Sequence, residues 1–384
     1  MALRRAVFFA QFVGGALSRP PLFQEFTAGF QGLMQRGTIH RPADAAALPG
    51  EAAQFAEAAN FARDNVVWKT VESTRGKYDW RETDMLLKEY TSVPHPPRWM
   101  LTLAYGNPLY DDGLAPHTPE GIDAFVAFVV ATVKRYQGRR ILWEIWCEPN
   151  SNFWAPSGGN VTQYIALTKS ISDGASRAGL GNETFIGPNS AMWWQYDVDM
   201  SFLEACLQAG LLQHWAAVNL HLYRASPPET VQDSFRSVRL LIEKYTPRGE
   251  TPKPIISGEW GYSTCAAPCS YYPYTGQVDE ILQAKYLARQ WLVNALQGVA
   301  SIWCSFFELD DDPTSMGGSL GVVRNRYNET GELHAPKLSY VAAHVMMRHL
   351  RGARFPVKRV TANIAARLSS EYAQDAFSIE RHSN

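Results

Sequence analysis

Two glutamates stand at the ends of apolar, β-rich segments: Glu148 follows residues 141–147 and Glu259 follows residues 254–258. Pro or Trp-Gly comes next in each case and would turn the chain. A carboxylate in such a place lies at the mouth of a parallel sheet or barrel, where α/β enzymes hold their catalytic groups. Two carboxylates that flank a glycosidic bond can cleave it. The pair therefore indicates glycoside hydrolysis.

Short β-rich runs alternate with amphipathic helical stretches from about residue 51 onward. We predict strands at 65–72, 99–105, 141–147, 185–188, 217–223, 255–259 and 300–307, and a first strand near 36–40. Helices are predicted at 117–133, 161–178, 199–209, 227–245, 278–297 and 337–350.

Strands rich in Val, Ile and Trp that alternate with helices and lack hairpin turns predict an α/β fold, a (β/α)8 TIM barrel. An open doubly wound sheet is the alternative, but neither Gly-x-Gly-x-x-Gly after an early strand nor a phosphate-binding loop motif is present. We expect an N-terminal segment at 1–30, the barrel at 31–350 and a C-terminal tail at 351–384. In this order Glu148 closes strand 4 and Glu259 closes strand 7, so they face each other across the mouth.

The composition fits one large domain, because 46% of the 384 residues are hydrophobic. Lys and Arg total 36 against 37 Asp and Glu, which does not indicate nucleic acid or an anionic membrane as a partner. No apolar run is long enough to span a membrane. A neutral carbohydrate is the expected partner, since aromatic rings, 12% of the chain, bind the apolar faces of sugars. The oligomeric state is left open.

The five cysteines are an odd number at irregular spacing and do not form a disulfide framework. Cys265 and Cys269, four residues apart, could bridge in an oxidising compartment. The first residues resemble a marginal signal peptide, which Gln11 weakens, and three Asn-x-Ser/Thr sequons would suit a secreted glycoprotein. We expect a protein that is secreted or in the secretory pathway, with a cytoplasmic location as the alternative.

The segments that hold the two glutamates resemble a known group of enzymes. The motifs WEIWCEPN at 143–150, NLHLYR at 219–224 and SGEWG at 257–261 look like strands 4, 6 and 7 of the retaining glycoside hydrolases of clan A, which are (β/α)8 barrels. Within the clan, the similarity is greatest to glycoside hydrolase family 39 and its bacterial polysaccharide-hydrolase relatives, through residues 105–110, Asn150 with Trp154, and the segment from 283 to 303. Residues 64–78 also resemble family 10 xylanases, but the His-rich strand 3 signature of that family is missing.

The resemblance implies a role for each residue that matches a motif. Glu148 matches the general acid/base and Glu259 the nucleophile. His221 and Tyr223 match the strand 6 residues that hold the nucleophile and the sugar, and Trp303 matches the tryptophan that floors the sugar subsite. Either His221 or Trp303 could instead be a plain core residue. The expected substrate-binding set also includes Asn107, Cys147, Asn150 and Trp154.

Cys147 departs from the clan pattern, which has Asn immediately before the acid/base. In the clan that amide binds the 2-hydroxyl of the sugar, an interaction that strengthens in the transition state. A thiol is a weak donor and acceptor. We therefore expect this stabilisation to be absent or to come from another group, and the substrate to be unusual at its 2-position.

Together these features predict a retaining β-glycoside hydrolase that cleaves an oligo- or polysaccharide by double displacement, through a covalent intermediate on Glu259. No cofactor and no metal are expected. The alternatives are a transglycosylase that uses the same residues and a catalytically impaired carbohydrate-binding barrel, which Cys147 alone favours. Sugar identity, linkage and endo or exo attack depend on loops.

Overall fold

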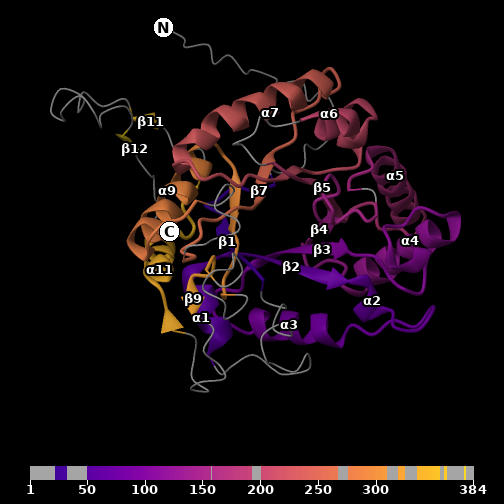
Figure 1. Ribbon diagram of the computed structural model, residues 1–384, viewed down its shortest axis with the longest axis horizontal. Coiled ribbons are helices and arrows are strands. Elements are labelled where there is room, and N and C mark those ends of the chain that lie inside the picture. The colour runs from indigo at the N-terminus through magenta and orange to yellow at the C-terminus, as the bar shows by residue number, and fades with distance from the viewer. Residues whose placement is uncertain are drawn as a thin grey trace, which may run out of the picture.

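Eight parallel strands form a closed barrel at the centre of the computed structural model, and helices surround it (Figure 1). The strands follow one another in chain order from β1 to β8, and β1 pairs with β8 to close the barrel. The predicted (β/α)8 fold is therefore confirmed. The structure describes residues 22–32, 50–156, 158–192, 200–266, 276–308, 319–324, 335–354, 359–360 and 376–377.

The barrel strands are β1 (Ala28–Gln31), β2 (Phe61–Val67), β3 (Arg98–Ala104), β4 (Leu142–Ile145), β5 (Thr184–Ala191), β6 (Val218–His221), β7 (Ile255–Glu259) and β8 (Ala300–Trp303). The seven strands predicted from residue 65 onward each have a counterpart, although β2 begins four residues earlier than predicted. The first strand of the barrel, β1, begins inside the predicted N-terminal segment 1–30. Residues 36–40, where the sequence predicted the first strand, lie outside the described residues.

The main helices are α1 (Glu51–Ala58), α2 (Trp68–Val71), α3 (Arg81–Thr91), α4 (Pro119–Arg135), α5 (Val161–Arg177), α6 (Ser201–Gln208), α7 (Val231–Tyr245), α9 (Glu280–Leu296) and α11 (Leu338–Leu350). All six predicted helices have a counterpart; α1, α2 and α3 are additional. Side-chain caps begin several of them, as at Thr118, whose hydroxyl accepts from the Gly121 amide. No helix in the described ranges combines the length and the apolar character of a membrane span.

The smaller elements lie between and after these helices. They are the 3₁₀ turns η2 (Asp111–Gly113), η3 (Leu211–Gln213) and η4 (Pro228–Thr230), and the short strand pairs β9 (Val323–Arg324) with β10 (Ala335–Pro336) and β11 (Arg359–Val360) with β12 (Ala376–Phe377).

The interior of the barrel has an apolar floor and a polar layer above it. The floor is a separate cluster made of Phe61, Met100, Leu142, Ile186, Ala217, Ile256, Ala300 and Ile302. Side chains two residues apart on a strand point to the same face. Two residues beyond four of the floor residues stand the buried polar side chains Arg63, Thr102, Glu144 and Asn219. Each must find a partner inside the barrel, because an unpaired buried polar group is costly.

The cysteines fall into two groups. Cys147, Cys206 and Cys304 are buried free thiols. Cys265 is disulfide-bonded, and Cys269, its expected partner, lies outside the described residues.

Candidate active site

The two glutamates meet at one end of the barrel around a single imidazole. His221, the last residue of β6, places Nδ1 2.8 Å from Oε1 of Glu148 and 3.5 Å from Oε2 of Glu259. The two carboxylate oxygens are therefore at most about 6.3 Å apart, the sum of these distances. The strand order predicted that Glu148 and Glu259 face each other, and the structure brings their carboxylates close together.

A tight turn after β4 presents Glu148. Trp146 and Glu148 both adopt positive φ angles, 62° and 46°, which non-glycine residues rarely do. The buried amide of Asn189 stabilises this turn, since it donates to the carbonyl oxygens of Ile145 (3.0 Å) and Trp146 (2.6 Å). The Asn189 carbonyl in turn accepts from the Glu148 amide at 3.2 Å. Asn189, at the end of β5, therefore fixes the direction in which Glu148 leaves the barrel.

The environment of Glu259 favours its ionised form. The Tyr223 hydroxyl donates to Oε1 at 2.7 Å, and Nη1 of Arg63 lies 2.8 Å from Oε2. Burial opposes ionisation, but His221, Arg63 and the Tyr223 hydroxyl together lower the pKa of Glu259 below its usual value. A carboxylate that is ionised and held on both oxygens is suited to act as a nucleophile.

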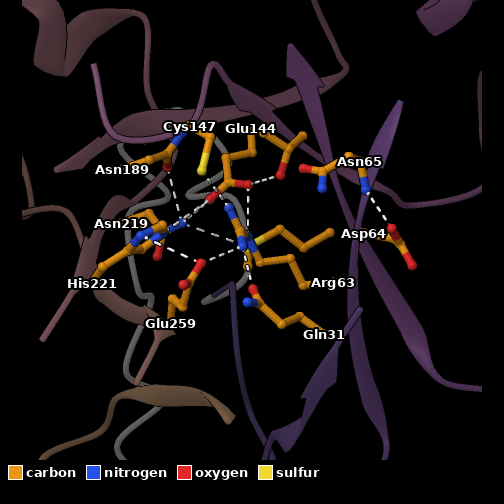
Figure 2. A network of polar contacts seen from close by, with 12 residues as sticks. Gln31, Arg63, Asp64, Asn65, Glu144, Cys147, Asn189, Asn219, His221 and Glu259 are labelled. Atoms are coloured by element: carbon orange, nitrogen blue, oxygen red, sulfur yellow. Dashed lines mark hydrogen bonds and ion pairs between the residues drawn. The ribbon is translucent and has the colours of Figure 1, made fainter. Parts of the chain in front are cut away.

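Arg63 lies at the centre of the polar layer and joins Glu259 to a second buried carboxylate (Figure 2). Its Nε is 2.8 Å from Oε2 of Glu144. The Glu144 carboxylate also accepts hydrogen bonds from Thr102, on Oε2, and from Asn219, on Oε1. Burial opposes ionisation of Glu144, but Arg63, His221 and Thr102 together outweigh it and lower the pKa of Glu144. One guanidinium thus lies against two carboxylates, one fully buried and one mostly buried.

His221 is fully buried, and its charge is set by the carboxylates around it. Burial favours the neutral ring, yet Glu259 and the nearby Glu144 and Glu148 raise the pKa of His221 to about 9. Nε2 has no hydrogen-bond partner among the described residues and lies 3.9 Å from Oε1 of Glu144. At neutral pH the ring is therefore a cation between three glutamates.

Cys147 lies beside the reacting groups. Its Sγ is 3.6 Å from Nη2 of Arg63, and it belongs to a group with His221 and Glu259 whose ligand atoms lie within 4.8 Å of one another. Burial raises the pKa of Cys147, so it is a neutral thiol. Sulfur, nitrogen and oxygen could together bind a metal ion. We assign none, because the guanidinium already lies against two of the three ligands and would repel it.

The other predicted site residues hold the surrounding loops. The Asn107 amide donates to the carbonyl of Glu72 at 2.8 Å, and the Asn150 amide donates to that of Ala191 at 2.8 Å. Two tryptophans are fully buried: the indole of Trp154 donates to Gln163, and that of Trp303 donates to the Leu320 carbonyl. Among the predicted residues, His221 and Tyr223 contact the two glutamates, and Sγ of Cys147 lies within 4.8 Å of ligand atoms of His221 and Glu259. Catalysis by the glutamates and substrate contacts by the other residues stay predictions.

Four residues that sequence reasoning did not select complete the site: Arg63, Glu144, Asn189 and Asn219. Their available signal was a polar or charged residue inside a strand of the barrel, most clearly Glu144 in the otherwise apolar β4. Gly258 shows how closely they fit, since a Cβ there would lie 2.2 Å from the Asn219 amide oxygen. The backbone of β7 thus leaves room for the amide that supports Glu144.

Comparison with known proteins gives matches of structure alone. No family model matches the chain, and no curated protein is significantly similar in sequence. A family 39 glycoside hydrolase from Bacteroides cellulosilyticus WH2 has a TM-score of 0.69 and 18% identity, over 89% of this chain and 67% of the other. A monomeric β-xylosidase from Caulobacter crescentus CB15 has a TM-score of 0.57 and 17% identity, over 84% and 68%.

A third match is a glucosidase from Croceicoccus marinus, with a TM-score of 0.61 and 14% identity over 88% of this chain and 69% of the other. At such low identity the likeness is one of fold. The chain therefore has the closed (β/α)8 barrel of the family 39 glycoside hydrolases and related glycosidases, as the resemblance of its sequence motifs predicted.

Proposed function

We propose that this protein is a retaining β-glycoside hydrolase that cleaves an oligo- or polysaccharide by double displacement. The observation that carries the proposal is the contact of one imidazole nitrogen with the carboxylates of both Glu148 and Glu259. Retaining enzymes hold their two carboxyl groups about 5 Å apart, whereas inverting enzymes need about 6.5 Å or more to fit a water molecule. The upper limit of about 6.3 Å set by His221 supports the retaining geometry.

In the first step, an oxygen of Glu259 attacks the anomeric carbon and forms an ester bond to it. The bond to the glycosidic oxygen breaks, and that oxygen takes a proton from the Glu148 side. The contacts with Arg63 and Tyr223 keep Glu259 ionised and aligned for the attack. Remote parts of the sugar can supply the binding energy for this alignment.

The proton for the leaving group is held by His221 and Glu148 together. Their hydrogen bond joins Nδ1 to Oε1 at 2.8 Å. The His221 cation can pass its Nδ1 proton across this bond to Glu148, which delivers a proton to the departing oxygen.

In the second step, Glu148 acts as the base. It takes a proton from a water molecule, whose oxygen attacks the anomeric carbon and releases Glu259 with retained configuration. If a sugar hydroxyl takes the place of water, the same residues perform transglycosylation. Water is the expected acceptor, and the ratio of the two products measures how well the site excludes it.

The proposal is tested by digestion of a panel of glycans, with the first product followed by NMR. A β-anomer that appears first supports retention, and an α-anomer that appears first contradicts it. The Glu259→Ala variant should lose turnover but keep glycan binding. Glu120→Ala is the matched control, because Glu120 is an exposed carboxylate on α4, and it should leave turnover unchanged. Binding of glycans without cleavage by the wild type would favour the non-catalytic barrel instead.

We also propose that the protein is secreted or passes through the secretory pathway. The disulfide at Cys265 supports this, because disulfides persist mainly in oxidising compartments. Fractionation of its native cells tests the location, and recovery of the protein from the cytoplasm alone would contradict it.

A further inference from the structure

Phe153 is a half-exposed aromatic ring next to the proposed acid/base. It lies in the loop after β4, and 53% of its surface is exposed. The other large apolar side chains exposed in the described part of the chain are aliphatic and belong to α7, α9 and α11: Leu240, Ile281, Leu338, Val341 and Val345. An isolated apolar side chain on a helix surface is ordinary. The exposure of an aromatic ring at the mouth of the barrel is not explained in this way.

Hydrogen bonds fix the backbone of Phe153 relative to Glu148. The amide and the hydroxyl of Ser151 both donate to the Glu148 carbonyl at 2.9 Å. The Phe153 amide donates to the Ser151 hydroxyl at 3.2 Å, and the Trp146 indole donates to the Phe153 carbonyl at 3.1 Å. The ring is thus held in a set place near the acid/base, and little order is lost when a ligand packs on it.

A second aromatic ring, that of Tyr105, links Phe153 to Trp146 in the turn that presents Glu148. Tyr105, directly after β3, has its ring centroid 5.8 Å from that of Phe153 and 6.0 Å from that of Trp146. Trp146, against which this ring packs, immediately precedes Cys147 in the turn that presents Glu148, and burial and the nearby Cys147 thiol raise the pKa of Tyr105. Tyr105 and Phe153 therefore form one aromatic wall that runs from Trp146 out to solvent.

The direction of this wall identifies what it can bind. The acid/base protonates the oxygen of the leaving group, so the surface that continues outward from Glu148 faces the leaving group. An exposed ring offers an apolar face to the C–H side of a pyranose, while the polar rim of the sugar stays in water. We propose that Tyr105 and Phe153 form the leaving-group subsite, and that its occupant is a sugar ring packed on Phe153. This inference rests on the proposed function.

The experiment separates leaving groups by size. The substrate with the highest kcat/KM in the glycan panel is compared with the glycosyl fluoride of the same sugar, whose leaving group is one atom. Phe153→Ala should lower kcat/KM for the glycan about 10-fold, the effect of about 1.4 kcal/mol of lost contact, and change that for the fluoride less than about 2-fold. Phe153→Trp should keep most of the activity on the glycan.

Leu240→Ala is the matched control, because Leu240 is an exposed apolar side chain on α7, 61% exposed, and it should alter neither substrate. An equal loss on both substrates in Phe153→Ala, or no loss on the glycan, would overturn the subsite. Failure of the proposed function looks different, since the wild type would then cleave neither the fluoride nor any glycan.

Discussion

Replacement of Arg63 by Met removes the cation that pairs with the buried carboxylate of Glu144 and the mostly buried carboxylate of Glu259. Nε and Nη1 each lie 2.8 Å from an oxygen, one of Glu144 and one of Glu259, and the three side chains are 4%, 0% and 16% exposed. Loss of one partner from a buried ion pair costs about 3–5 kcal/mol, because the remaining charge is left uncompensated. The hydrogen bonds from Thr102 and Tyr223 to the two carboxylates remain. We therefore expect the free energy of unfolding at pH 7 to decrease by an amount within this range.

The loss should depend on pH in a definite direction. Arg63 helps to lower the pKa of both Glu144 and Glu259 in the folded protein. The stability that comes from a lowered carboxyl pKa is present above the unfolded value, about 4.3, and is lost as pH falls through the folded value. The difference between wild type and Arg63→Met should therefore be largest near neutral pH and shrink in acid. The double variant Arg63→Met with Glu144→Gln should recover part of the lost stability, since one of the two unpaired carboxylate charges is gone.

Urea unfolding followed by tryptophan fluorescence measures these differences. Arg135→Met is the matched control: Arg135 pairs with Asp84 at the surface, where the side chains are 42% and 39% exposed, so the loss should be under about 1 kcal/mol. A similar small loss for Arg63→Met at pH 7, or a loss that stays constant as pH falls well below about 4.3, would refute the role of Arg63 as counter-ion.

Three further predictions concern other parts of the site. Cys147→Asn adds an amide donor, so the kcat/KM ratio of a substrate to its 2-deoxy analogue should rise at least about 10-fold over wild type, and an unchanged ratio would contradict this. The protonated His221 stabilises the fold fully below about pH 6.5, and this contribution is lost as pH rises through about 9. The stability difference between wild type and His221→Gln should thus shrink by about 3 kcal/mol from pH 6 to pH 10, and parallel curves would disprove it. Gly258→Ala, whose Cβ would lie 2.2 Å from Asn219, should lower the unfolding free energy by about 1–3 kcal/mol, whereas wild-type stability would show that the strand can shift.

The fold could be predicted because its signals are local. Alternating β-rich and amphipathic segments recur along the chain, and each strand end carries its turn residues. The first strand escaped prediction because Ala28–Gln31 (AGFQ) has no β-branched residue, and its place is set by pairing with β2 and β8. Tertiary pairing rather than local sequence decides such a strand.

The approach of Glu148 and Glu259 at the barrel mouth could be predicted, but the side chains that support them could not. Arg63 contacts residues 81 and 196 positions further along the chain, and one sequence does not reveal that these carboxylates share a guanidinium. Asn107 and Asn150 illustrate the opposite difficulty. Their motifs indicated substrate contacts, which stay a prediction, but not the bonds of both amides to backbone carbonyls, because the direction of an amide depends on the loop that holds it.

Trapping of the covalent intermediate tests the central claim most directly. A 2-deoxy-2-fluoro glycoside with a good leaving group, made from the sugar that the glycan panel identifies, should label the wild type once. Peptide mass spectrometry should then place the sugar on Glu259, and Glu259→Ala should stay unlabelled. A label on Glu148 or Cys147, or no label on an enzyme that still hydrolyses the parent glycoside, would contradict double displacement through Glu259.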